Sequence, residues 1–219
     1  MDGPSAIPTE TGRLLAVQLL SPAFPTGAFA YAQGLEWAMD CGAVRDGASL
    51  TRWIGDVLEH GSGWSDAVIL SLSLRPEADH AALDDLARAL CLTSERLTET
   101  LEQGAAFARV AAVLTGTPET PTALPVAVGR ACAGLGLPRT DIIALYLQGL
   151  ALALVQAAVR FQPLGQTEGQ RILAGLSPLI LQLAVRAETA SEADLGGCAI
   201  GAEIASARHE CMETRIFRT

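Results

Sequence analysis

The 219-residue sequence contains no lysine, because all fifteen of its basic residues are arginines. A Walker A loop needs a lysine to hold nucleotide phosphates, so the chain is not a P-loop nucleotide hydrolase. Schiff-base chemistry, with pyridoxal phosphate or with a carbonyl substrate, needs a lysine amine and is excluded too. The absence of lysine therefore removes two large classes of enzyme.

Metal-ligating residues are also few. The chain has three histidines, and none of them is followed by another histidine or a cysteine four positions further on. His209 and Glu213 share a helical face, but such a pair is common on helix surfaces. The five cysteines include no CxxC pair, which is typical of a reduced intracellular protein. We expect no metal site and no cofactor.

No nucleophile is recognisable, because the chain has no GxSxG elbow. The stretch "GSGWSD" at 61–66 lacks the preceding strand that an elbow needs, and is expected to connect two helices with Ser65 or Asp66 as the cap. Glu95, Glu99 and Glu102 are spaced by three and four, which predicts an acidic, solvated helix face.

The net charge of −9 argues against a nucleic-acid partner, since binding to phosphate backbones depends on clustered basic residues. The N-terminal residues carry acids and prolines where a signal peptide would carry a positive region and an apolar stretch. We expect a cytoplasmic protein.

One long hydrophobic run, Asp141–Arg160, approaches the length of a membrane span. Gln148 and Gln156 interrupt it on nearly the same helical face, and charged residues close both its ends. This pattern favours the buried central helix of a soluble protein, with no membrane association.

Helical periodicity continues along the chain, and segments with strict period-two alternation are missing. The sequence therefore predicts an all-α fold, a single-domain helical bundle of roughly nine or ten helices spanning 1–219. Residues 1–12 are expected to be flexible and 213–219 to form a C-terminal partner-binding tail. We expect a new helix to start at Ser177–Pro178, and the last helix to cover about 194–212.

Only ten residues are aromatic, yet four of them lie in "SPAFPTGAFAYAQGLEWAMD", residues 21–40. Two prolines followed by apolar residues predict a helix from Ala28 to Asp40. On that helix Gln33, Glu36 and Asp40 would form one narrow polar stripe. Gly34 in its middle indicates close approach of another backbone.

The C-terminal stretch "RHECMETRIFRT", residues 208–219, places Ile216 and Phe217 between Arg215 and Arg218. An apolar pair flanked by guanidinium groups suits docking into a partner's groove. A segment folded back on its own core fits the same residues, and both alternatives stand.

Three stretches resemble the UreF family of urease accessory proteins. "SPAFPTGAFAYAQGLEWA" is similar to its N-terminal signature, "RFQPLGQTEGQRIL" (160–173) to its Leu-Gly-Gln segment, and "RHECMETRIFRT" to its ending. The matching residues of the first two are Pro25, Gly27, Ala28, Phe29, Tyr31, Gly34, Leu35 and Glu36, then Leu164, Gly165 and Gln166. The three matches occur in family order and span nearly the whole chain.

This resemblance implies a non-catalytic, all-helical chaperone that forms a homodimer. It implies binding to UreD (also called UreH) and to the GTPase UreG, in an assembly that promotes nickel insertion into apo-urease. The C-terminal motif is associated with UreD binding in the family. Its counterparts here are Arg208, His209, Glu210, Arg215, Ile216, Phe217 and Arg218.

Some positions depart from the family pattern. Ala32 replaces a usual serine, Thr26 stands where an aliphatic residue is common, and Glu213 replaces a frequent tyrosine. The change at Glu213 removes an aromatic contact and adds a charge within the tail.

Two alternatives come from other functional classes. One is a regulator that stimulates UreG by inserting an arginine finger. The other is an all-helical enzyme with a buried apolar pocket near Asp141–Phe161.

Overall fold

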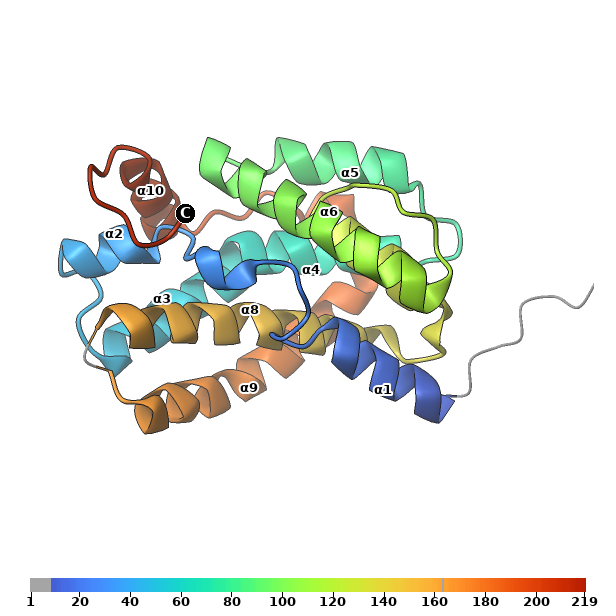
Figure 1. The fold of residues 1–219 in the computed structure, drawn as a ribbon, viewed down its shortest axis with the longest axis horizontal. Coiled ribbons are helices and arrows are strands. Elements are labelled where there is room, and N and C mark those ends of the chain that lie inside the picture. Colours follow the sequence, from blue (N-terminus) through green and yellow to red (C-terminus); the bar gives the residue numbers. More distant parts are fainter. Residues whose placement is uncertain (1–8, 163) are drawn as a thin grey trace, which may run out of the picture.

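The computed structural model of the chain describes residues 9–162 and 164–219, and over these residues all regular secondary structure is helical, without a strand (Figure 1). The predicted all-α bundle is confirmed. Residues 1–8 of the predicted flexible segment 1–12 lie outside the described residues, whereas 9–12 begin the first helix.

The α-helices are α1 Thr9–Leu19, α2 Leu35–Asp40, α3 Gly47–His60, α4 Ser62–Ser73, α5 His80–Ala89, α6 Ser94–Thr115, α7 Leu124–Cys132, α8 Arg139–Phe161, α9 Gln166–Thr189 and α10 Ile200–His209. The 3-10 helices are η1 Ala28–Ala30, η2 Ala133–Leu135 and η3 Glu192–Asp194.

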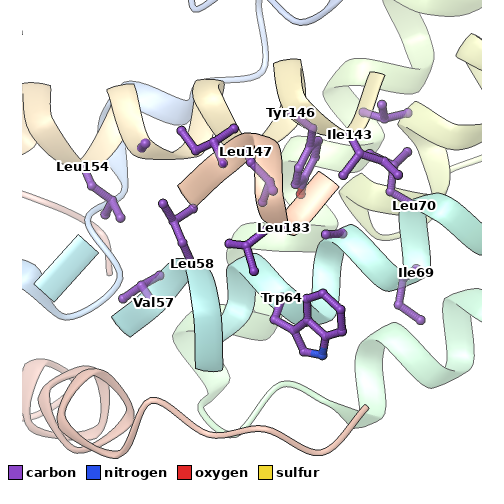
Figure 2. Packing of buried hydrophobic residues seen from close by; sticks show 14 of the residues in the cluster. Val57, Leu58, Trp64, Ile69, Leu70, Ile143, Tyr146, Leu147, Leu154 and Leu183 are labelled. Carbon is purple, nitrogen blue, oxygen red and sulfur yellow. The ribbon is translucent and has the colours of Figure 1, made fainter. Parts of the chain in front are cut away.

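Helix α4 lies in the middle of the bundle. Nine of its twelve residues are buried, and it packs against α3, α7, α8 and α9. A helix that is apolar all round can be stable only when it is surrounded in this way. Figure 2 shows Trp64 and Leu70 of α4 among side chains of α3, α8 and α9, including Leu58, Leu147 and Leu183.

Helices α8 and α9 form the longest pair, joined by a short connection, and they pack tightly against each other. Gly169 of α9 has no side chain, and a Cβ there would lie 3.0 and 3.1 Å from Val155 and Val159 of α8. Both helices are long and apolar enough, by length and composition alone, to cross a membrane. Buried α8 residues such as Ile143 and Leu147 instead contribute to the core, as predicted for this run.

The predicted helix start at Ser177–Pro178 is wrong. Helix α9 continues through Pro178, which is exposed. A proline inside a helix removes one backbone hydrogen bond and strains the preceding turn. Here Leu176, Ile180 and Leu183 are buried on both sides of the proline, so packing holds the two halves in one helix.

Two further boundaries differ from those expected. Helix α4 begins at Ser62 without a side-chain cap, so neither Ser65 nor Asp66 has the capping role assigned to them. Helix α10 is shorter than 194–212, because Ser191 and Asp194 close a separate 3-10 turn by reciprocal hydrogen bonds. After His209 the chain leaves the helix and crosses to the N-terminal motif.

Candidate functional site

The two family-like stretches at opposite ends of the chain meet in space. We call residues 25–36 the N-terminal motif and residues 208–219 the C-terminal segment. The Arg218 amide donates to the Ala30 carbonyl at 2.7 Å, and the Ala32 amide donates to the Thr219 carbonyl at 3.1 Å. In Figure 1 the C-terminal end lies beside α2 and the loop that precedes it. Of the two alternatives for the C-terminal segment, the structure shows it folded back on its own chain.

The N-terminal motif is not the single helix 28–40 that the sequence predicts. It consists of η1, an extended stretch, and α2 after Gly34, with left-handed backbone at Gly27 (φ 76°), Gln33 (φ 52°) and Gly34 (φ 75°). A Cβ at Gly34 would lie 2.4 Å from the Ser206 backbone nitrogen of α10. The expected close backbone approach is therefore confirmed, although Gly34 precedes a helix instead of lying within one.

The predicted polar stripe of Gln33, Glu36 and Asp40 does not exist, because Gln33 lies outside α2. Asp40 is exposed, whereas Glu36 is only 1% exposed and Gln33 is buried. The Glu36 carboxylate accepts hydrogen bonds from the amides of Ile216 (2.7 Å) and Phe217 (2.8 Å). The Glu36 side chain thus faces the C-terminal segment, whereas the Gln33 side chain binds Glu99 and Ser62.

The acidic face of α6, predicted to be solvated, is instead a row of acceptors for the C-terminal segment. Glu95 binds Arg215 at 2.7 Å. Both carboxylate oxygens of Glu102 accept from Arg218, each from a different guanidinium nitrogen, and the Nη2–Oε1 distance is 2.9 Å. The buried Glu99 accepts a hydrogen bond from the Thr219 hydroxyl. Because the three glutamates are spaced by three and four residues, they lie on one face of α6, and each contacts a different residue of the C-terminal segment.

His209 and Glu210 attach the start of the C-terminal segment to the same helix. The His209 ring is fully buried between Glu95 (2.7 Å) and Glu36 (3.2 Å). Glu210 Oε1 accepts from the backbone nitrogens of Ser94 (2.9 Å) and Glu95 (3.2 Å), which are free donors at the N-terminus of α6. Its contacts with Ser94 lower the pKa of Glu210.

Several ionisable groups at this site are perturbed. Hydrogen bonds from Arg218 and then from Tyr31 lower the pKa of Glu102. Burial, reinforced by the hydrogen bond to Glu102, raises the pKa of Tyr31 well above its usual range. Burial also raises the pKa of Glu99 despite the nearby Arg96. The surroundings therefore stabilise the charged form of Glu102 and destabilise the charged form of Glu99.

A second buried polar cluster lies beneath the motif. Asp66 of α4 binds the Arg96 guanidinium at 2.8 Å and the Tyr146 hydroxyl at 2.7 Å, and burial raises the pKa of Asp66. The cluster borders a cavity of about 110 Å³, which is walled by residues of 19–31 and by Gly149, Leu150 and other residues of α8. A pocket beside α8 is the feature that the enzyme alternative requires.

The predicted partner-binding residues divide into two groups. Arg208, Glu210, Arg215, Ile216 and Arg218 are exposed, whereas His209 and Phe217 are buried. Among the motif residues, Tyr31, Gly34, Leu35 and Glu36 are buried, while Pro25 and Phe29 are exposed. Gly27 and Ala28 lie at the start of η1, Leu164 and Gly165 lie in the connection into α9, and Gln166 is the first residue of α9.

Sequence reasoning missed Arg160, the last arginine of α8. Its guanidinium donates to the Phe29 carbonyl at 2.7 Å and lies 4.7 Å above the centre of the Phe217 ring. Arg160 thus joins α8 to both ends of the chain. The available signal was its position as the first residue of the stretch 160–173 that resembles the family.

Among residues 9–162 and 164–219, no group of three or more His, Cys, Asp or Glu side chains is placed to hold a metal ion. The carboxylates of Glu36, Glu95 and Glu102 are used in contacts within the chain. On the outer face of the site two apolar side chains, Phe29 and Ile216, are 73% and 69% exposed.

Comparisons with known proteins agree with the resemblance seen in the motifs. A model of the UreF family matches residues 44–177. The urease accessory protein UreF of Paracoccus denitrificans is 60% identical over 215 residues, covering 98% of this chain and 100% of the relative. UreF of Cereibacter sphaeroides strain ATCC 17029 is 56% identical over 94% of this chain and 98% of its own. UreF of Ruegeria pomeroyi is 41% identical over 98% of this chain and 100% of its own.

Proposed function

This chain belongs to the UreF family of urease accessory proteins, and from that membership we propose that it is a non-catalytic cytoplasmic scaffold for urease maturation. It binds UreD (UreH) and the GTPase UreG, and the assembly promotes nickel insertion into apo-urease. Nickel is the cargo of this assembly. A homodimer is part of the proposal, and sedimentation of the purified chain tests it.

The observation that supports UreD binding is the outer face of the site. We call Phe29, Arg215, Ile216 and Arg218 the composite surface, since the motif and the C-terminal segment both contribute to it. Phe29 and Ile216 are exposed apolar side chains, and side chains of Arg215 and Arg218 are 40% and 56% exposed. Exposed apolar residues accompanied by arginines are typical of the energetically important centre of protein interfaces. UreD is the partner that we assign to this surface.

Deleting residues 208–219 would not test this assignment cleanly. The deletion removes buried His209 and Phe217 and leaves Glu36 and Glu95 without their partners. A protein truncated in this way could lose UreD through damage to its own core. Substitutions at exposed positions avoid this problem.

The test is the double variant Phe29→Ser/Ile216→Ser, assayed by co-purification with UreD. Removing two interface anchors is expected to weaken capture by about tenfold or more. Leu181→Ser/Val185→Ser on α9 is the matched control, because both side chains are also exposed and apolar, at 60% and 62%. Capture at full yield by Phe29→Ser/Ile216→Ser would refute the assignment of UreD to the composite surface.

The nickel step has its own measurement. Apo-urease is mixed with nickel, UreD, UreG and GTP, and urease activity is followed with and without this chain. We expect activation to depend on the chain, and the chain alone to hydrolyse neither urea nor GTP. Equal activation without it would contradict the maturation role.

The GTPase-regulator alternative remains a separate hypothesis. Arg208 is an exposed arginine of the C-terminal segment, so a finger could come from this end of the chain. GTP turnover by UreG with and without the chain discriminates the two. Arg208→Ala would abolish a stimulation that depends on this residue, and unchanged or reduced turnover with the parent chain would remove the alternative.

A further inference from the structure

We propose that Glu36 is the positioning residue that holds the C-terminal segment in the form that its partner recognises, with His209 as the side chain that joins Glu36 to Glu95. The partner half of this inference rests on the proposed function. The effect of Glu36 on the C-terminal segment can be measured without any partner.

The Glu36 carboxylate is committed entirely to the far end of the chain. Oε1 accepts from the Ile216 amide at 2.7 Å, while Oε2 accepts from the Phe217 amide at 2.8 Å and lies 3.2 Å from His209 Nε2. Because the side chain is buried, its charge is tolerable only when such donors surround it. Two successive backbone amides of an otherwise irregular segment converge on one side chain.

His209 joins Glu36 to Glu95. Its Nδ1 faces Glu95 Oε2 at 2.7 Å and its Nε2 faces Glu36 Oε2 at 3.2 Å. Arg215 lies on the other oxygen of Glu95 at 2.7 Å. A chain of polar contacts therefore runs from Arg215 through Glu95 and His209 to Glu36.

Holding both amides determines which side chain of the apolar pair faces outward. Phe217 is 4% exposed and lies under the Arg160 guanidinium, whereas Ile216 is 69% exposed. With the 216 and 217 amides bound to Glu36, Phe217 points into the chain and Ile216 points toward the partner. Without this anchor, the orientation of the pair is no longer specified.

Glutamine cannot replace Glu36 in this role. The two side chains have the same length, but glutamine offers one acceptor oxygen and one donor NH₂ group. One of the two backbone amides would therefore face another donor. His209 Nε2 would also face an amide in place of a carboxylate.

The experiment uses Glu36→Gln in the full chain, with Asp40→Asn as the matched control one turn further along α2, where the side chain is exposed. Hydrogen exchange of the amides at 216–219 is measured without a partner, followed by capture of UreD. In Glu36→Gln we expect exchange in this segment to be about tenfold faster or more, with the core helices unchanged, and UreD capture to fall. Asp40→Asn should match the parent chain in both measurements.

A second pair of variants acts from the other side of the contact, in case Glu36→Gln does not fold. Ile216→Pro removes the amide hydrogen that Glu36 Oε1 accepts, whereas Ile216→Ala keeps it. We expect faster exchange at 217–219 in Ile216→Pro only. Both variants change an exposed side chain, so the global fold should persist in each.

Nitrogen-15 NMR of the His209 ring supplies a readout that a purely structural role would not move. The Nε2 resonance should shift in Glu36→Gln, because the carboxylate that faces Nε2 is replaced by an amide, and it should stay unchanged in Asp40→Asn. An unchanged Nε2 resonance in folded Glu36→Gln would overturn the contact assigned to His209. Unchanged exchange at 216–219 in folded Glu36→Gln would overturn the positioning role. Failure of the parent chain to capture UreD would instead overturn the proposed function.

Discussion

Glu36 and Phe217 are 181 positions apart in the sequence, yet the carboxylate of one accepts a hydrogen bond from the amide of the other at 2.8 Å. The contact makes the two ends of the chain parts of one surface. A substitution in the N-terminal motif is therefore expected to alter the C-terminal segment, and the reverse. The N-terminal motif and the C-terminal segment, which are far apart in the sequence, form a single structural unit.

Gly34→Ala should destabilise the protein through both conformation and contact. The left-handed backbone at φ 75° costs about 1–2 kcal/mol for a residue with a Cβ. The added Cβ would also lie 2.4 Å from the Ser206 nitrogen, which forces α2 and α10 apart. We expect a total loss of more than about 2 kcal/mol in the free energy of unfolding by denaturant titration.

Gly42→Ala is the control for that measurement. Gly42 has φ 77°, but a Cβ there meets nothing within 4 Å. Its cost should be limited to the conformational part, about 1–2 kcal/mol. Equal losses in the two variants would show that the approach of α10 to Gly34 contributes nothing.

Phe217→Ala should release the C-terminal segment while leaving the bundle folded. Removing a buried phenylalanine typically costs about 3–5 kcal/mol, but a terminal segment can detach locally before the protein unfolds. We expect proteolysis near 213–219 to accelerate strongly, with little change in helix content by circular dichroism. Ile216→Ala, at an exposed position, should leave the proteolysis rate near that of the parent chain.

Arg96→Met should destabilise the core, because it leaves Asp66 and Glu99 buried without their cation. Breaking a buried ion pair by removing one partner typically costs about 3–5 kcal/mol. Arg171→Met removes an exposed ion pair with Glu168 and should cost less than about 1 kcal/mol. Thermal or denaturant unfolding of the two variants measures the difference, and similar costs would contradict the role assigned to Arg96. Adding Asp66→Asn to Arg96→Met should recover part of the loss.

Glu99→Gln should change how stability depends on pH. Burial raises the pKa of Glu99 above that of an exposed glutamate, so the folded chain binds more protons than the unfolded chain in the window between the two values. In that window, starting at about pH 4.3, this group makes the parent chain less stable as pH rises. The stability of Glu99→Gln relative to the parent should therefore increase with pH, as followed by denaturant titration. A difference that stays constant or decreases would contradict the raised pKa.

Much of the fold follows from sequence patterns that have a direct physical meaning. The run 141–160 is apolar and capped by charges, and it forms α8 in the core. The errors occur where a local rule competes with packing. Pro178 predicts a helix boundary, but buried leucines and isoleucines on both sides keep α9 continuous. The stretch 28–40 has helical spacing, but Gly34 supplies a left-handed turn where α10 approaches.

The candidate site was less accessible to sequence reasoning. Glu95, Glu99 and Glu102 have the spacing of a solvated helix face, and this spacing is identical whether water or another segment covers it. The two cases differ only in the tertiary structure, in which Arg215, Arg218 and Thr219 lie against these carboxylates. Asp66 likewise has the properties of a helix cap until Arg96 and Tyr146 are found beside it.

The sequence by itself determined the helical class of the protein, the position of its most apolar helix, and the enzyme classes that the absence of lysine excludes. These properties depend on residue type and local periodicity, which act over a few turns of chain. Only the tertiary structure decided that Glu36 faces the C-terminal segment, that His209 is buried between two carboxylates, and that Ile216 faces outward while Phe217 faces inward. A polar side chain has no periodic signal that names its partner, because a hydrogen bond or an ion pair depends on distance in space and not on separation along the chain.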